Sequence, residues 1–197
     1  NCEQLSSLIH ELLNLSEIES GRLSLSLASC DLTCLLREIY QHFVPMAKEH
    51  GLCLNKQISD GLTLVADANR LRQIINNVLS NAIKYTEKGQ VVLRAYEQGS
   101  GSTACTVIEV QDTGIGIKES DFDAVFCEYK KVHKVLNKQV DSTGLGLPIA
   151  KRLIELHQGS ISLTSTPGQG STFTIYLPRC SKNTGGCDGS SQTSTHH

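Results

Sequence analysis

The chain has 197 residues, of which 39% are hydrophobic and 19% are charged, and its formal net charge is -2. This length and composition are typical of one globular domain with room for a short appendage. The near-neutral charge gives no reason to expect nucleic acid as a partner. No apolar run approaches the roughly 18 residues of a membrane span, and the first residues lack the layout of a signal peptide. We therefore expect a cytoplasmic domain, whether or not the parent protein is bound to a membrane.

The sequence contains eight cysteines, but their placement does not support a disulfide framework or a zinc site. There is no Cys-x-x-Cys pair, and the closest two, Cys30 and Cys34, have no cluster of Cys or His residues near them in the sequence. A free thiol among apolar residues behaves as a small hydrophobic group. We expect reduced cysteines, as in other proteins of the cytosol.

The first half of the chain predicts helices with short strands between them. Leucines spaced by three and four residues predict a packed helix over residues 3–19. Alternation of leucine with serine predicts a short half-buried strand over residues 23–27. Asp31 is a suitable N-cap for a helix that extends to about His50, and we expect Pro45 to kink or interrupt that helix. Strands are predicted at residues 52–58 and 62–65.

The second half predicts two helices and two β-hairpins. A helix is predicted over residues 69–86, with Asp67 near its N-cap, and another over residues 145–157. The hairpins comprise residues 91–97 with 105–111 and residues 160–165 with 171–177. Residues 116–143 lack steady periodicity, and residues 181–197 have the composition of a disordered polar tail. The predicted fold class is therefore α+β, with a mostly antiparallel sheet covered on one face by helices.

Four polar side chains share one stripe of the predicted helix over residues 69–86. At roughly 100° per residue, they fall together and apart from an apolar face. They are Asn77, Asn81, Lys84 and Tyr85. The stripe offers amide oxygens and an ammonium group to a ligand. A solvated helix face with a lysine near its C-terminus has the same pattern.

The segment Asp112-Thr-Gly-Ile-Gly-Ile117 follows a predicted strand directly. An ionised aspartate only accepts hydrogen bonds, so Asp112 can accept one from the amino group of adenine. Gly114 and Gly116 allow the backbone to pass close to a flat ring, because they have no Cβ atom. A tight turn with positive φ selects the same residue types.

Thr143-Gly-Leu-Gly-Leu147 lies at the start of the predicted helix over residues 145–157. Unpaired N–H groups and the positive end of the helix dipole suit phosphate oxygens there. An ordinary glycine-containing helix entry has the same sequence. The order and spacing of the three segments nevertheless indicate one nucleotide pocket, and no Walker pattern occurs in the sequence.

These segments resemble the ATP-binding catalytic domain of two-component sensor histidine kinases, within the GHKL superfamily. Residues 77–84 match the N box, residues 112–116 the G1 box and residues 144–147 the G2 box, while residues 168–173 match the closing hairpin. The resemblance implies a two-layer GHKL (Bergerat) fold that binds ATP and Mg²⁺, with Asn81 as metal ligand. It implies nucleotide contacts from Asn77, Asn81, Lys84, Tyr85, Asp112, Gly114, Gly116, Ile117, Gly144, Leu145, Gly146, Leu147 and Thr172.

The resemblance also implies a mobile ATP lid over residues 118–143, with Phe122 or Phe126 as its aromatic anchor. Basic lid side chains could reach the triphosphate or form a solvated run; they are Lys130, Lys131, His133, Lys134 and Lys138. The lid departs from the family pattern, because Phe126-Cys-Glu-Tyr129 fits the F box only loosely. Ser142 stands where the G2 box commonly has its first glycine.

By the same resemblance, residues 1–20 match the second helix of a dimerisation hairpin and residues 21–180 the catalytic domain. The phosphoacceptor histidine would lie upstream, on the first helix of that hairpin. His10 lacks the motif that follows an acceptor histidine, so we expect it on the surface of the helical bundle. The implied partners are the upstream helix, a dimer partner and the receiver domain of a response regulator.

Asn77 separates the kinase hypothesis from one alternative. GHKL ATPases that drive conformational change carry a glutamate at this position to activate water, whereas an amide is not a base at neutral pH. We therefore expect transfer of phosphate to a histidine and slow spontaneous hydrolysis. Two alternatives stay open, namely a nucleotide-binding module that is catalytically silent or biased towards phosphatase activity, and an ATPase that drives conformational change.

Overall fold

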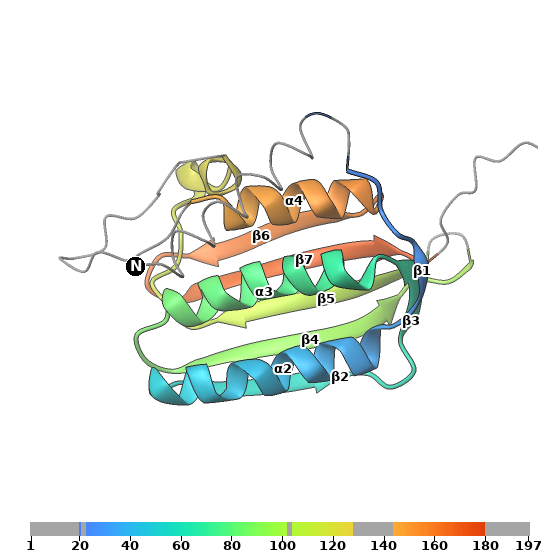
Figure 1. Ribbon diagram of the computed structural model, residues 1–197. Helices are drawn as coiled ribbons and strands as arrows, with labels where there is room; N and C mark the ends of the chain where they lie inside the picture. The colour runs from blue at the N-terminus through green and yellow to red at the C-terminus, as the bar shows by residue number, and fades with distance from the viewer. Residues whose placement is uncertain (1–19, 21–22, 102–103, 128–143, 180–197) are drawn as a thin grey trace, which may run out of the picture.

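The computed structural model describes residue 20 and residues 23–101, 104–127 and 144–179 of the chain. Five strands form the main sheet (Figure 1), in the order β2 (Cys53–Ile58), β4 (Gln90–Gln98), β5 (Cys105–Asp112), β7 (Gly170–Pro178) and β6 (Ser160–Thr166). The β2–β4 pair is parallel, and the other three pairs are antiparallel. A separate antiparallel pair joins β1 (Ala28–Asp31) to β3 (Thr63–Ala66). The predicted hairpins are confirmed.

Three helices cover one face of the main sheet, as Figure 1 shows: α2 (Leu32–Glu49), α3 (Ala68–Lys84) and α4 (Gly146–Leu156). Helix α3 lies in the middle of this layer, between α2 and α4. Two short 3₁₀ helices, η2 (Glu119–Asp121) and η3 (Ala124–Phe126), precede α4 in the chain. The predicted α+β class, with helices on one face of a mostly antiparallel sheet, is confirmed.

The core lies between the helical layer and the sheet. Antiparallel pairing places Leu93 opposite Val110 and Val110 opposite Phe173, and all three side chains are buried against the helices. Because side chains alternate between the two faces of a strand, Asp112 lies on the same face as Val110. The site residue at the end of β5 therefore faces the helices and not the open side of the sheet.

Helix α2 begins as the sequence predicts, but it is not interrupted. Its N-cap Asp31 accepts a hydrogen bond from the backbone N–H of Cys34 at 2.9 Å. The predicted interruption at Pro45 is wrong, since the helix continues to Glu49. Pro45 lies on the exposed side of the helix, where water can bond the carbonyl group that a proline leaves without a donor. The next turn also buries Ala47, so the apolar face continues past the proline.

The strand predicted over residues 23–27 is also wrong. These residues form no strand, and β1 begins only at Ala28. Strand β3 has four residues, and all four pair with residues 28–31. Leu23 packs against the core, while Leu27 is 48% exposed. The alternation of leucine and serine thus reflects the partial burial of Leu23 and Leu25, although this segment pairs with no strand among the described residues.

Some predictions fall outside the described residues, namely the helix over 3–19, the tail over 181–197 and the five basic lid residues. Within the described part of the chain, five cysteines are free: Cys30, Cys34, Cys53, Cys105 and Cys127. Only Cys30 among them is buried. No helix among the described residues has the length and apolar character needed to cross a bilayer.

Candidate functional site

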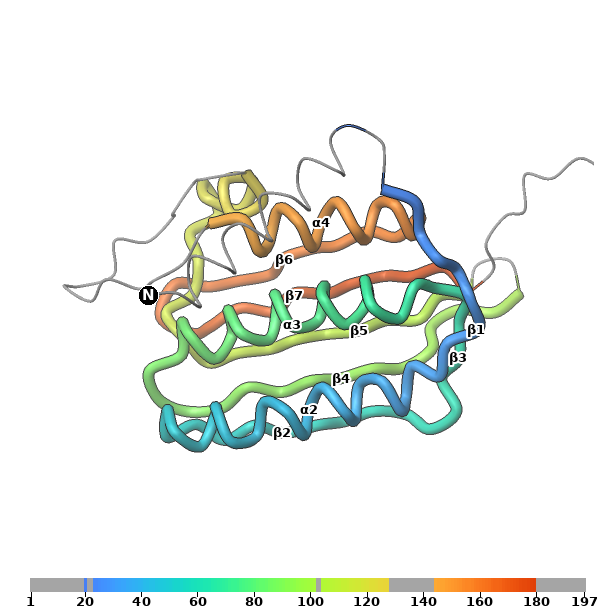
Figure 2. Tube along the Cα trace, viewed as in Figure 1, coloured from blue at the N-terminus to red at the C-terminus, as the bar shows by residue number. Residues whose placement is uncertain are grey.

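One end of the sheet brings the predicted segments together. The C-terminal end of α3, the N-terminal end of α4 and the end of β5 all lie there (Figure 2). The Asn77 amide nitrogen on α3 donates to the carbonyl oxygen of Gly146 on α4 at 2.9 Å. The backbone N–H of Ile115, just past β5, donates to the carbonyl oxygen of Tyr85 at 3.3 Å. Helix α3 therefore contacts both glycine-containing segments.

Asp112 is held as a buried hydrogen-bond acceptor. Asp112 as a whole residue is only 6% exposed. One oxygen, Oδ1, accepts from the backbone N–H of Gly114 at 2.8 Å and from that of Ser171 at 3.2 Å. Burial raises the pKa of Asp112, and the two N–H donors only partly oppose that shift. Within the described part of the chain, the second oxygen, Oδ2, accepts no hydrogen bond.

The two glycines after Asp112 are required by close packing. A Cβ atom on Gly114 would overlap the carbonyl oxygen of Tyr85, and one on Gly116 would overlap the carbonyl oxygen of Thr166. Gly116 also has a φ of +67°, whereas Gly114 is not in the left-handed region. A tight turn that needs positive φ therefore accounts in part for glycine at position 116, but it does not account for glycine at position 114. Ile117 closes the loop as a buried residue that is 9% exposed.

The polar stripe on α3 exists as predicted and is half-buried. Asn77, Asn81, Lys84 and Tyr85 all have intermediate exposure. Tyr85 is the C-cap of α3, and its backbone N–H donates to the carbonyl oxygen of Asn81. The Asn81 side chain makes no hydrogen bond in the part of the chain that the structure describes. Its amide oxygen could therefore serve as a metal ligand, since Mg²⁺ prefers oxygen donors.

The start of α4 has the features that suit an anion. Gly144 has a φ of +75°. Leu145 follows as an N-cap that is 1% exposed and has no side-chain capping bond to the helix. Gly146 is the first residue of the helix, and Leu147 packs against the core. The Leu145 side chain therefore does not cap the N–H groups of Gly146 and Leu147, the first two residues of α4, and such groups suit phosphate oxygens.

The structure does not bring Thr172 to this site. Thr172 pairs with Gln111, and its neighbour Phe173 lies in the core, so the Thr172 side chain is on the opposite face of the sheet from the helices. Ser171 takes the place beside Asp112, because its backbone N–H bonds the carboxylate. Thr172 therefore lies apart from the other predicted site residues, and strand alternation from Phe173 predicts Ser171 beside Asp112.

A second missed residue is Ser165 on β6. Its hydroxyl group contacts Ser171 and accepts from the backbone N–H of Ile117, both at or below 3.0 Å. Serine is common on exposed strands, so no sequence signal marked Ser165.

Phe126, one of the two predicted aromatic anchors, contacts the helical layer and the sheet. Its ring meets Phe173 edge to face, with centroids 6.3 Å apart. The Lys151 ammonium nitrogen on α4 lies 5.4 Å from the centre of the Phe126 ring, within range of a cation–π interaction. Phe122 also packs against the core but makes no ring contact in the described residues. The segment before residue 128 is therefore docked on α4 and β7.

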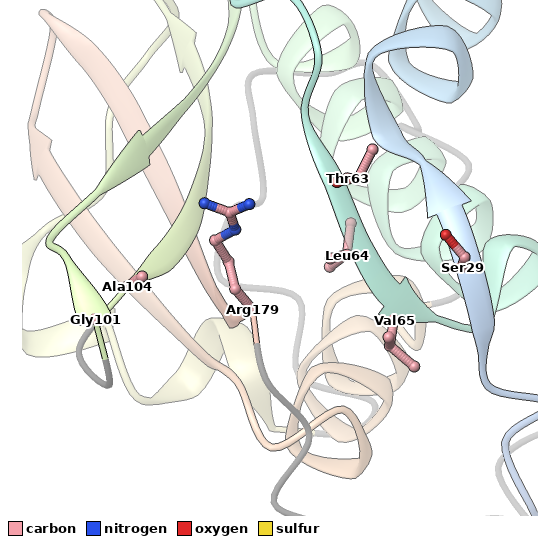
Figure 3. Close-up of a pocket in the computed structure, with 7 residues that line it drawn as sticks. All are labelled: Ser29, Thr63, Leu64, Val65, Gly101, Ala104 and Arg179. Atoms are coloured by element: carbon pink, nitrogen blue, oxygen red, sulfur yellow. The ribbon is translucent and has the colours of Figure 1, made fainter.

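A separate cavity lies at the opposite end of the sheet, between the β1–β3 pair and the β4–β5 connection (Figure 3). Its volume is about 400 Å³, and its lining residues are Ser29, Thr63, Leu64, Val65, Gly101, Ala104 and Arg179. None of the predicted site residues lines it. Among the described residues, no group of three or more His, Cys, Asp or Glu side chains could hold a metal ion.

Sequence comparison places this chain in a known family. Residues 66–181 match the family model described as histidine kinase-, DNA gyrase B- and HSP90-like ATPase. The chain is 39% identical over 180 residues to the circadian input-output histidine kinase CikA of Synechococcus elongatus, covering 89% of this chain and 23% of that protein. It is 41% identical over 180 residues to the sensor protein GacS of Pseudomonas syringae, covering 90% and 20%. The chain thus spans less than a quarter of the length of these two relatives.

Solved structures agree with this placement. The full-length ShkA structure, in complex with AMPPNP, matches with a TM-score of 0.77 and 34% identity over 88% of this chain and 35% of that one. The Acinetobacter baumannii histidine kinase AdeS matches in fold, with a TM-score of 0.74 and 22% identity over 90% of this chain and 80% of that one. The family model covers more than half of the chain and includes all three predicted boxes. The chain therefore belongs to the family of histidine kinase-, DNA gyrase B- and HSP90-like ATPases.

Proposed function

We propose that this chain binds ATP with Mg²⁺ and donates the γ-phosphoryl group to a histidine on a helix in another part of the whole protein. The observation that carries the proposal is the buried Asp112 carboxylate beside the polar stripe of α3. Oδ2 of this carboxylate accepts no hydrogen bond within the described residues, and it is not among their buried unpartnered atoms, which leaves it for a ligand to bond. A purine amino group would supply a donor to Oδ2.

The other site residues fit the remaining parts of ATP. Gly114, Gly116 and Ile117 form the loop beside the adenine, and Tyr85 flanks the ring from the end of α3. The start of α4 supplies the N–H groups of Gly146 and Leu147 for the phosphates, with Gly144 and Leu145 in the turn that precedes it. Lys84 adds a positive charge at the end of α3, where phosphate oxygens would lie. The docked Phe126 fixes the segment from which the predicted lid continues.

Asn81 would hold the magnesium ion through its amide oxygen. Mg²⁺ is commonly bound by one or two protein oxygens together with substrate phosphates and water, so a single amide fits this ion. When bound, the ion neutralises developing charge on the phosphates. The protein residues around it orient the triphosphate and keep the γ-phosphoryl group accessible to the acceptor.

Asn77 favours transfer to a histidine over hydrolysis. Its amide nitrogen donates to Gly146, and an amide cannot take a proton from water. The acceptor imidazole is itself a nucleophile and needs no base of this kind. Positioning and charge neutralisation are then sufficient for the domain to act as phosphoryl donor. The family expectation adds a dimer partner, a receiver domain of a response regulator and a cytoplasmic location to this proposal.

Titration with a fluorescent ATP analogue, with and without Mg²⁺, tests binding. Addition of a separate fragment with the acceptor helix and radiolabelled ATP then tests transfer. We expect Mg²⁺-dependent binding, label on the acceptor histidine and little free phosphate without the acceptor. Binding without transfer would favour a silent module, and steady phosphate release without an acceptor would favour an ATPase. Failure to bind the analogue would refute the proposal.

A further inference from the structure

Ser165, near the end of β6, connects three segments that surround Asp112. Its Oγ atom accepts a hydrogen bond from the backbone N–H of Ile117 at 2.8 Å. The same hydroxyl group donates to the carbonyl oxygen of Gly170 at 2.8 Å, and it lies 3.0 Å from Oγ of Ser171. Ser165 thus joins the loop after β5 to the turn that opens β7.

The positions of the protons in this cluster follow from its partners. A serine hydroxyl has one proton and two acceptor lone pairs. The Gly170 carbonyl oxygen can only accept, so the Ser165 hydroxyl group donates its proton to a hydrogen bond with that oxygen. The Ile117 N–H group can only donate, so its hydrogen bond occupies one of the two lone pairs on Ser165 Oγ. Ser171 must then donate its own proton to the second lone pair, and its Oγ atom is left with acceptor capacity alone.

This arrangement sets the polarity of the corner next to Asp112. Ser171 is 6% exposed, and its backbone N–H bonds the Asp112 carboxylate at 3.2 Å. An ionised carboxylate is also an acceptor only. The side chains of these two bonded residues therefore have acceptor capacity alone. A purine with a 6-amino group offers matching donors at that position, whereas a 6-oxo purine offers an acceptor there and has its donor on the neighbouring ring nitrogen N1.

We propose that Ser165 is a positioning residue that fixes the selectivity of the site for a 6-amino purine over a 6-oxo purine. This inference rests on the proposed binding of ATP and deepens it. Ser165 acts through Ser171, whose hydroxyl proton it binds, and through the loop that ends at Ile117. A site that discriminates by paired polar groups rejects mismatched analogues strongly, because the mismatch leaves buried groups unpaired.

Close backbone packing makes the arrangement dependent on Ser165. A Cβ atom on Gly170 would overlap the carbonyl oxygen of Asp112, and Gly116 packs equally closely on Thr166. The two backbone segments therefore touch on both sides of the serine cluster. Removal of the Ser165 hydroxyl leaves the Ile117 N–H and the Gly170 carbonyl without their partner, and it frees the Ser171 proton to turn towards the carboxylate corner.

The test compares ATP with inosine triphosphate, which differs from ATP only in the 6-oxo group and the ring proton that accompanies it. Each competes with a fluorescent ATP analogue for the 197-residue chain and its variants. For Ser165→Ala we expect the ratio of ATP affinity to inosine triphosphate affinity to fall about tenfold. Ser165→Thr retains the hydroxyl group and should retain the ratio. Ser162→Ala, an exposed serine on the same strand, is the matched control.

Equal weakening of both nucleotides in Ser165→Ala would overturn the inference, since a merely structural serine would have that effect. An unchanged ratio would overturn it as well. If Ser165→Ala unfolds below the assay temperature, Ser165→Cys keeps a similar volume with a much weaker donor and acceptor, and its ratio should also fall. A wild-type chain that binds neither nucleotide would instead refute the proposed function.

Discussion

Asp112 owes its proposed role to the way in which its two oxygens are used. The backbone N–H groups of Gly114 and Ser171 both bond Oδ1. An asparagine here would have to direct its single oxygen to these donors, and its NH₂ group would then face the purine amino group. We expect Asp112→Asn to weaken ATP binding about 30-fold, or about 2 kcal/mol, because a hydrogen bond to a charged group is lost. Analogue titration measures the loss, with the exposed Asp60→Asn as control.

The raised pKa of Asp112 also predicts how stability depends on pH. Burial raises the pKa in the folded protein, so the folded chain binds this proton more readily than the unfolded chain. Relative to Asp112→Asn, the wild-type protein should therefore gain stability as the pH falls through the raised pKa, until the ordinary carboxyl pKa is passed. Urea unfolding of both proteins at a series of pH values measures the difference. A difference that stays constant, or moves the other way, would refute the assignment of a buried charge.

Replacement of Gly114 by alanine should affect both stability and nucleotide binding, whereas replacement of Gly168 should affect stability alone. A Cβ atom on Gly114 would lie 2.9 Å from Asp112 Oδ1 and overlap the Tyr85 carbonyl oxygen, whereas one on Gly168 would meet no atom within 4 Å. Gly168 has a φ of +78°, so alanine is strained there by its backbone alone. We expect both alanine variants to lose about 1–2 kcal/mol of stability. Only Gly114→Ala should also lose binding of the ATP analogue.

At the residue scale, sequence patterns located the groups that stand in dense motifs. Asp112, Gly114 and Asn77 were found because each lies among other unusual residues. Ser165 was not found, because a serine on a strand has no distinctive neighbours. The bond from Asn77 to Gly146 joins residues 69 positions apart, and no local pattern encodes it.

At the scale of elements, the Asn77 bond couples α3 to α4. Its loss should loosen the N-terminal turn of α4, which we propose as the phosphate site. We expect Asn77→Ala to lower the free energy of unfolding by about 1 kcal/mol and to weaken analogue binding several-fold. Asn76→Ala is the matched control, because the Asn76 side chain has the same exposure class and no hydrogen bond among the described residues. Equal effects in both variants would contradict the coupling.

The elements themselves were predictable where burial imposes a clear period. Helix α3 was predicted over residues 69–86 and extends from Ala68 to Lys84, because its apolar face has a strict helical repeat. The strand predicted over residues 23–27 failed, since a strand needs a partner and β3 pairs with residues 28–31 instead. Periodicity reports which side chains are buried, whereas strand pairing depends on segments that are distant in sequence.

At the scale of the whole molecule, Asp67 ties together distant parts of the chain. Its carboxylate accepts from the backbone N–H groups of Asn69, Arg70 and Ser26. Its own N–H donates to Nε2 of the buried His157, just past α4, at 3.2 Å. The segment before β1, the start of α3 and the end of α4 therefore meet at one residue.

This convergence predicts an unequal cost for two N-caps. Asp67 accepts three backbone N–H groups, whereas Asp31, the N-cap of α2, accepts one. We expect Asp67→Ala to lower the free energy of unfolding by about 2 kcal/mol and Asp31→Ala by about 1 kcal/mol. Urea denaturation of the two variants provides the comparison. A larger loss for Asp31→Ala would be evidence against the tethering role of Asp67.

The place of β7 in the sheet has a consequence for synthesis of the protein. This strand is the last described element in the chain, yet it lies between β5 and β6 and supplies the Ser171 N–H group to Asp112, 59 residues earlier. A ribosome therefore releases every other part of the pocket before the strand that completes it. A nascent chain that ends before residue 170 would keep the β5 edge unpaired and could not hold Asp112 in place. We therefore expect the proposed nucleotide binding only once β7 has been made.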